Sequence, residues 1–175
     1  MNLSIVTQVR QNHALEHATI HLLSNKQPDL RLVGRSDLKG FWLYGDVDTC
    51  AVADAVIEAL ERLNRNEYWL ATHPRCGTNL ATTALVTGGA AYAAAMLPTR
   101  SWFTRLVRVA LAVAVALLTV RPLGLTVQRH VTTTADMSGM RVRSVLRRMA
   151  GKVVVHRVLL TRHEQAEEYV LHSAR

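Results

Sequence analysis

Two long stretches without charged side chains constrain the fold of this chain more than any other feature. Residues 80–97 contain no charged side chain, and the apolar run over 109–127 is interrupted only by Arg121. Each stretch has roughly the 18–20 residues that a helix needs to cross a bilayer. Because a short segment joins them, the pattern predicts a transmembrane helical hairpin. A buried helical hairpin within a soluble protein is the alternative interpretation.

The first of these stretches is rich in Gly, Ala and Thr, and it contains the small-residue pair Gly89 and Ala93. Small side chains let two helix backbones approach closely. We therefore expect this stretch to pack on another helix, in a membrane-protein partner or in a second copy of the chain. Trp102 and Phe103, which follow it, are residue types suited to the membrane–water interface.

A hairpin returns the chain to the membrane face that it left, so residues 1–79 and 128–175 are expected on the same face. The connecting segment 98–108 carries three arginines, and the sequence flanking the hairpin on the other side carries more. The positive-inside tendency therefore places both termini in the cytoplasm and the protein in the cell membrane. We find no signal-peptide pattern at the N-terminus, where no basic region precedes an apolar run.

The net charge of +8 lies mostly in the segment after the second apolar stretch. A basic segment beside a membrane span is suited to anionic lipid, so the lipid bilayer is the expected partner. Aromatic side chains make up only 5% of the chain and are not interleaved with the basic ones, so nucleic acid is not expected as a partner. The two cysteines, Cys50 and Cys76, do not form a disulfide framework and fit a reducing compartment.

The rest of the sequence predicts a small soluble α+β domain. Its expected elements share clear periodicity or β-forming composition. They are an amphipathic helix at 3–23, a β-hairpin at 30–45 with turn residues 36–40, a helix at 48–64 capped by Asp48 or Thr49, a short strand at 68–71, a strand or helix at 140–149, a strand at 152–161 and a short helix at 162–173.

The predicted fold class is thus α+β with an inserted transmembrane helical hairpin. Residues 1–79 form the N-terminal part of the soluble domain, residues 80–127 form the hairpin, and residues 128–175 form the basic C-terminal part of the soluble domain.

Within the first expected helix, the run His13-Ala14-Leu15-Glu16-His17 has the pattern H-x-x-E-H. On a helix, His13 and His17 lie one turn apart on one face, where both can bind the same metal ion. Glu16 projects beside them, where a general base for a metal-bound water would sit. An ordinary surface pair of histidines is the alternative interpretation.

A zinc site needs at least one more protein ligand. Cys76 is the first choice, because a thiolate is a strong zinc ligand and Gly77 lets the backbone approach closely. His73 is the second choice and His130 the third, since both flank the hairpin on the same expected face. One open position would then hold water, with Glu16 to deprotonate it. The alternatives are a buried structural thiol at Cys76 and a lipid-headgroup contact at His130.

The five-residue run resembles the motif of the inverzincin metallopeptidases. That resemblance implies that His13 and His17 bind zinc and that Glu16 is the base. Those enzymes add a second glutamate further along the chain, whereas the sequence around position 90 here is apolar and membrane-like.

A broader resemblance covers most of the chain, and it points to an uncharacterised family of small two-span bacterial membrane proteins. It supports the membrane architecture and brings no established activity. The motifs that carry it are Asn12-His13-Ala14-Leu15-Glu16-His17-Ala18-Thr19, Gly34-Arg35-Ser36-Asp37, Gly40-Phe41 with Leu43-Tyr44-Gly45, His73-Pro74 with Cys76-Gly77-Thr78-Asn79, and Gln128-Arg129-His130.

These patterns predict an integral membrane protein that binds a metal, with zinc as the expected cofactor. The leading interpretation is a zinc-dependent hydrolase that acts at the membrane surface on peptide or lipid-linked substrates. The alternative is a non-catalytic subunit of a membrane protein complex, with a structural cluster of histidine and cysteine. A histidine ligand to a tetrapyrrole is a third option, although neither span contains a histidine.

Overall fold

The computed structural model describes residues 4–73, 76–134 and 136–162, and it divides into two units. The first unit combines Met1–Thr72 with Thr133–Arg175, and the second is His73–Thr132. Helices and an antiparallel sheet are both present, which confirms the α+β part of the predicted fold class.

The first unit contains a four-stranded antiparallel sheet with the strand order β1-β2-β4-β3. The predicted hairpin is formed by β1 (Val33–Asp37) and β2 (Gly40–Tyr44). A second hairpin is formed by β3 (Met140–Ala150) and β4 (Val153–Arg162), and β2 pairs with β4 to join the two. From the sequence, residues 140–149 could form either a strand or a helix, and in the structure they belong to a strand.

Glycine is required in the turns of both hairpins. Gly40 has φ of +143°, and a Cβ at this position would overlap the carbonyl group of Val158 on β4. Gly151 has φ of +61° between β3 and β4, which are joined by a tight turn. Because L-residues with a side chain rarely adopt positive φ, these two glycines fix where the strands reverse.

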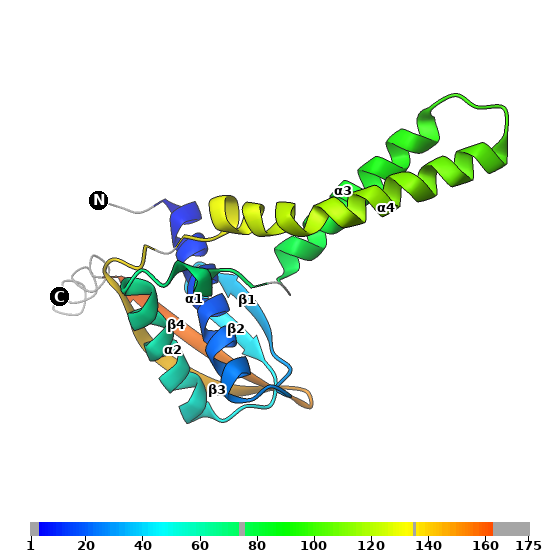
Figure 1. Cartoon of the computed structure of the whole chain (residues 1–175). Helices are drawn as coiled ribbons and strands as arrows, with labels where there is room; N and C mark the ends of the chain where they lie inside the picture. The colour runs from blue at the N-terminus through cyan, green and yellow to red at the C-terminus, as the bar shows by residue number, and fades with distance from the viewer. Residues whose placement is uncertain (1–3, 74–75, 135, 163–175) are drawn as a thin grey trace, which may run out of the picture. The chain divides into compact units, whose positions relative to one another are not determined.

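Two helices cover one face of this sheet, α1 (Ile5–Lys26) and α2 (Thr49–Asn64) (Figure 1). The Asp48 side chain caps α2 by accepting a hydrogen bond from the N–H of Ala51 at 3.0 Å, as one of the two predicted caps. The core between helices and sheet is formed by apolar residues that are at most 1% exposed: Ala14, Leu15, Ala18, Phe41, Leu43, Val52, Ala55, Val56, Ala59, Leu63 and Val158.

The strand expected at 68–71 is wrong, because this segment is the 3-10 helix η1 (Tyr68–Ala71). Asn66, with φ of +67°, turns the chain sharply after α2. Leu70 and Ala71 are then buried, and η1 packs against α1 instead of joining the sheet. The helix expected at 162–173 lies outside the described residues, apart from its first residue, which ends β4.

The second unit is a helical hairpin of α3 (Gly77–Met96) and α4 (Trp102–Val127), followed by a π-helical turn, η2 (Gln128–Thr132). α4 begins well before residue 109, because the Ser101 side chain caps it by accepting from the N–H of Thr104. Part of the segment 98–108 that was expected to form a loop is therefore helix.

One helix in the described part of the chain is long and apolar enough to cross a membrane. It is the segment Trp102–Val120 of α4, with 19 residues and a mean hydropathy of 2.0. α3 contains several Thr and Gly residues and one Asn, and it does not reach that apolarity. The second span of the predicted transmembrane hairpin is therefore not confirmed.

The close approach inside this hairpin occurs at Gly124 of α4. A Cβ on Gly124 would overlap the side chain of Asn79 on α3, whereas a Cβ on Gly89 would meet nothing within 4 Å. The contact of Gly89 and Ala93 with a further helix thus stays a prediction.

The buried His156 of β4 leads us to expect a specific pH dependence of stability. Its side chain is fully buried, and Nε2 lies 3.1 Å from the hydroxyl oxygen of Thr49. Burial lowers the pKa of His156, and the charge of Arg147 lowers it further, against a smaller opposite effect of Asp48. On acidification the unfolded chain takes up this proton before the folded chain does, so stability is lost as the pH falls from about 7 through the folded-state pKa.

We expect the melting temperature of the full chain in detergent to fall between pH 7.5 and pH 5. The variant His156→Gln removes this titration, so its melting temperature should fall less over the same range. Circular dichroism of the two proteins at each pH measures the difference. Equal pH dependence in the two proteins would show that His156 does not cause the effect.

Candidate metal centre

The first half of α1 is held in place by buried polar side chains. Arg162, at the end of β4, donates to the side-chain oxygens of Gln11 at 3.0 Å and Asn12 at 2.9 Å. The other side of the Asn12 amide donates to the backbone oxygen of Asp37 on β1 at 2.7 Å. Arg10 donates to the backbone oxygen of Thr133 at 2.8 Å. These bonds fix α1 against both hairpins of the sheet just before the H-x-x-E-H run.

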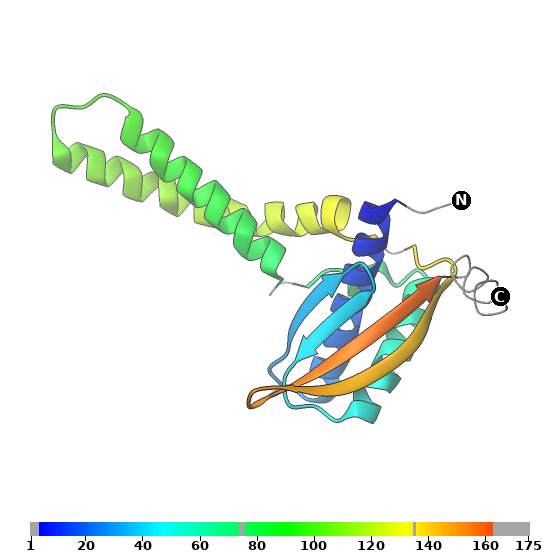
Figure 2. The ribbon, with the colours of Figure 1, turned by 180° about the vertical axis from the view of Figure 1, so that it is seen from behind.

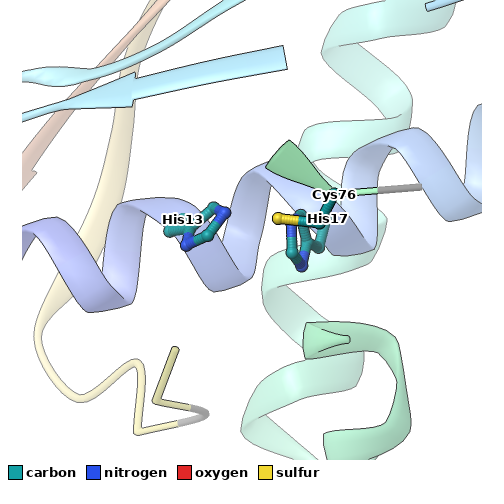
Figure 3. A group of neighbouring side chains, drawn as sticks. All are labelled: His13, His17 and Cys76. Atoms are coloured by element: carbon teal, nitrogen blue, oxygen red, sulfur yellow. The ribbon is translucent and has the colours of Figure 1, made fainter. Parts of the chain in front are cut away.

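The run lies within α1, so the predicted spacing of His13 and His17 is realised. The centroids of their two rings are 4.3 Å apart, with an angle of 62° between the ring planes (Figure 3). His17 is almost fully buried, with 2% exposure, and His13 is partly buried. The pair is therefore part of a packed surface and not an ordinary pair on an exposed helix face.

The orientation of His17 is set by η1. Its Nδ1 lies 2.9 Å from the backbone oxygen of Ala71. A carbonyl oxygen can only accept, so Nδ1 carries the proton in the neutral tautomer, which leaves the lone pair on Nε2. Metal-binding histidines characteristically donate their second ring nitrogen to a carbonyl or carboxylate, which fixes both tautomer and ring orientation.

Cys76 follows Ala71 by five residues, so the chain itself keeps it within reach of His17. It occupies the N-cap position of α3, where its sulfur accepts from the N–H of Thr78 at 3.4 Å. The N-terminal end of a helix dipole favours a negative charge, and a thiolate is the form of cysteine that binds metals. The thiol is partly buried and makes no disulfide bond.

The structure brings His13, His17 and Cys76 together, as Figure 3 shows. Each offers one ligand atom, and the three atoms lie within 4.8 Å of one another. Around a tetrahedral zinc ion, nitrogen and sulfur ligands are separated by about 3.3–3.8 Å, as follows from Zn–N and Zn–S bond lengths. The upper limit of 4.8 Å is thus somewhat wider than the ligand separations in such a site.

Glu16 lies outside this group of three. Its side chain is 4% exposed, and one carboxylate oxygen accepts a hydrogen bond from the hydroxyl of Ser36 on β1. The carboxylate also occupies the space above Gly34, where a Cβ would overlap it. Its assignment as a general base stays a prediction.

His73 and His130 also lie outside the group. His73 is held by its backbone, because the side-chain amide of Gln128 accepts from its N–H and donates to its carbonyl oxygen, each at 3.0 Å. The side chain of Asn79 donates to the same carbonyl oxygen at 3.4 Å. His130 is exposed in η2. Of the three candidates for the third ligand, the structure places Cys76 beside the histidine pair.

One turn beyond the pair, His21 packs edge-on against Trp69 of η1, with ring centroids 5.3 Å apart. Burial lowers the pKa of His21, and electrostatic interactions with His17 and Arg62 act in the same direction. An uncharged imidazole is compatible with this apolar neighbour, and His21 is not a member of the group of three.

Reasoning from the sequence missed the supporting residues of the site. Ser36 and Gly34 receive Glu16, Ala71 orients His17, and Gln128 holds the backbone three residues before Cys76. Ser36, Gly34 and Gln128 belong to the motifs that carried the broader resemblance, so a signal was present. Its structural meaning was not visible, because each contact joins segments far apart in the chain.

Comparison with known proteins identifies the family. The family described as "Domain of unknown function (DUF6391)" matches residues 8–145, and the chain belongs to it. An uncharacterized protein of Picosynechococcus sp. (strain ATCC 27264 / PCC 7002 / PR-6) is 37% identical over 139 residues, which cover 74% of this chain and 68% of that protein. No solved structure matches the chain. The resemblance to an uncharacterised family is thereby confirmed, while its two-span membrane character and the inverzincin resemblance are not.

Proposed function

We propose that this member of the DUF6391 family is an integral membrane protein that binds zinc through His13, His17 and Cys76. The observation that carries the proposal is the approach of three ligand atoms to within 4.8 Å of one another. Two imidazoles and a thiolate form a ligand set typical of zinc in proteins. The carbonyl partner of His17 supplies the outer hydrogen bond that such sites use to orient a ligand.

We further propose that the site is hydrolytic. Zinc with three protein ligands keeps a fourth position for water and makes that water more acidic. In this chain His17 is held in a fixed tautomer by Ala71, and Cys76 is held at the start of α3. Glu16 would accept the proton, and peptide or lipid-linked compounds are the expected substrates.

One observation favours a non-catalytic alternative. The Glu16 carboxylate is bound to Ser36 and covers Gly34, so it serves to attach α1 to β1. In that alternative the metal is structural and the chain is a subunit of a membrane protein complex. The two functions differ in the effect of replacing Glu16 on activity.

The membrane part of the proposal is supported by the apolar surface of the second unit. Leu85 of α3 is 78% exposed and Leu118 of α4 is 81% exposed, and only 11% of the stretch Trp102–Val120 is buried. Apolar surface of this extent needs lipid or a protein partner to cover it. Three threonines of α3 donate their hydroxyls to carbonyl oxygens one turn earlier, as Thr83 does to Asn79 at 2.7 Å, so these groups need no water.

Metal binding is tested on the full chain purified in detergent. After zinc loading and dialysis we expect about one zinc per chain, as a site of three protein ligands implies. His17→Ala and Cys76→Ser should each lower the zinc content below half, because each removes a ligand. Serine is itself a good N-cap, so Cys76→Ser leaves the start of α3 intact. Elemental analysis by mass spectrometry gives the stoichiometry.

His130→Ala and Cys50→Ser are the matched controls, since they remove a histidine and a cysteine outside the group. Both should bind as much zinc as the original chain. Cobalt loading adds a second readout, because a thiolate ligand gives an intense near-ultraviolet charge-transfer band that Cys76→Ser should abolish. Less than about half an equivalent of zinc in the original chain would refute the metal site.

Catalysis is tested with Glu16→Gln, which keeps the size of the side chain and an oxygen to accept from Ser36. We expect it to retain zinc and to lose at least a hundredfold in the rate of zinc-dependent hydrolysis, the usual contribution of a general base. The rate is measured on a panel of peptide and lipid-linked substrates. A zinc-loaded original chain without hydrolysis on this panel would favour the non-catalytic alternative, as would a partner that copurifies in equal amount.

Membrane insertion is tested by extraction and labelling in bacterial cells. We expect the chain to stay in the membrane pellet at alkaline pH, because α4 is apolar along its exposed length. In a background without Cys50 and Cys76, a membrane-impermeant maleimide should label Thr99→Cys in intact spheroplasts and Asp54→Cys only after permeabilisation. Extraction into the alkaline supernatant would contradict insertion, and the reverse labelling would contradict cytoplasmic termini.

A further inference from the structure

The face of the sheet opposite α1 and α2 carries a groove with a volume of about 340 Å³. Figure 2 shows this face, on which no described helix lies. The groove is on the first unit alone, and it shares no residue with the group of His13, His17 and Cys76. Its lining combines cationic, aromatic and apolar side chains: Arg35, Asp37, Trp42, Tyr44, Arg148, Met149, Ala150 and Val155.

Strand register brings these residues together from distant parts of the sequence. Tyr44 of β2 is opposite Val155 of β4, and Val155 is opposite Arg148 of β3. In the neighbouring row, Arg35 of β1 is opposite Trp42 of β2. Residues directly opposite one another in a sheet point to the same face, so both rows present their side chains to the groove.

The Trp42 side of the groove is held rigidly. Arg157 of β4 lies over the Trp42 ring, with 4.6 Å from its guanidinium carbon to the ring centroid, and donates to Asp37 at 2.8 Å. The Trp42 N–H donates to the other oxygen of Asp37 at 3.1 Å. Burial alone would raise the pKa of Asp37, but the bonds from Arg157, Lys39 and Trp42 outweigh it and leave this pKa below its ordinary value. Asp37 is therefore ionised and neutralises Arg157.

The remaining charge in the groove is positive. No ion pair involves Arg35 or Arg148 among the described residues, and both side chains are exposed. Arg157 is only 8% exposed in its side chain and does not line the groove, so the positive charge open to a ligand is that of Arg35 and Arg148.

We propose that this groove binds a nucleotide. Arg35 and Arg148 hold the phosphate, because a guanidinium group presents paired donors that match phosphate oxygens. The base lies against the aromatic side chains of Trp42 and Tyr44. The groove volume is at the lower end of the roughly 300–1,000 Å³ that small-molecule sites occupy, which suits one nucleotide.

The base and phosphate that the groove would bind can belong to a free mononucleotide or to a single strand of nucleic acid. The volume of the groove favours the mononucleotide. The sequence did not predict any nucleotide ligand, because Arg35 and Arg148 lie on strands from opposite parts of the chain and only the register of the sheet joins them. The proposal does not depend on the metal site, so its test uses chains that carry the original His13, His17 and Cys76.

The test is calorimetric titration of the full chain, in a detergent with neutral headgroups, with adenosine monophosphate. We expect one binding site per chain, and weaker binding of adenosine and of inorganic phosphate, since each lacks half of the ligand. Arg35→Gln and Arg148→Gln should each weaken binding about tenfold or more, the effect of losing a charged hydrogen bond. Arg31→Gln, which changes an exposed arginine outside the groove, should leave the affinity unchanged.

Aromatic contact is tested at Tyr44. Tyr44→Phe should retain binding because the ring is kept, whereas Tyr44→Leu should weaken it. Melting temperatures within a few degrees of the original chain show that each variant is folded. Absent binding at millimolar adenosine monophosphate, or equal affinity in Arg35→Gln, Arg148→Gln and the original chain, overturns the proposal. Binding of a thymidine oligonucleotide or of vesicles containing phosphatidylglycerol without binding of the mononucleotide overturns it as well.

Discussion

The close approach of α1 to β1 at Glu16 determines how the first unit is arranged. The Glu16 carboxylate lies directly over Gly34 and accepts a hydrogen bond from Ser36 two residues later. A side chain at position 34 would overlap the Glu16 carboxylate, so Glu16 can lie here only because residue 34 is glycine. On the next position of the same helix, His17 is directed to η1, where its Nδ1 lies 2.9 Å from the backbone oxygen of Ala71.

Helix α1 also supplies the hydrogen-bond acceptors for a buried arginine of β4. Arg162 is 6% exposed, and it donates hydrogen bonds to neutral oxygens of Gln8, Gln11 and Asn12 in α1. Burial lowers the pKa of Arg162, because removal from water disfavours the charged guanidinium. Three acceptors in good geometry compensate for that loss. The polar residues of α1 that precede His13 thus attach the helix to β4, and the histidine pair follows directly after them.

Much of the fold could be predicted from the sequence, because its elements have strong local signals. The helices around Val52 and Leu15, the first β-hairpin and the strand at 152–161 follow from periodicity and turn residues. The error at 68–71 arose because aromatic composition indicates a strand, whereas the turn at Asn66 and the burial of Leu70 against α1 decide the structure.

The candidate site was predicted in part. The spacing of His13 and His17 is a local property of a helix, so the sequence was sufficient to place them on one face. The nearness of Cys76 could be argued only from connectivity, and the structure is what brings its thiol beside them. The hydrogen bond between Glu16 and Ser36 and the one between Gln128 and the backbone of His73 are tertiary contacts, for which a single sequence contains no direct signal.

β3 forms an edge of the sheet in the described part of the chain, and it is the longest of the four strands. An edge of this length is ordinarily a template for aggregation by strand addition. Here the register shifts between Val142 and Ser144, which interrupts the regular ladder. The strand also carries arginine at four positions, 141, 143, 147 and 148. A like strand from another molecule would meet an irregular backbone and repelling charges, so the sheet resists polymerisation without a covering element.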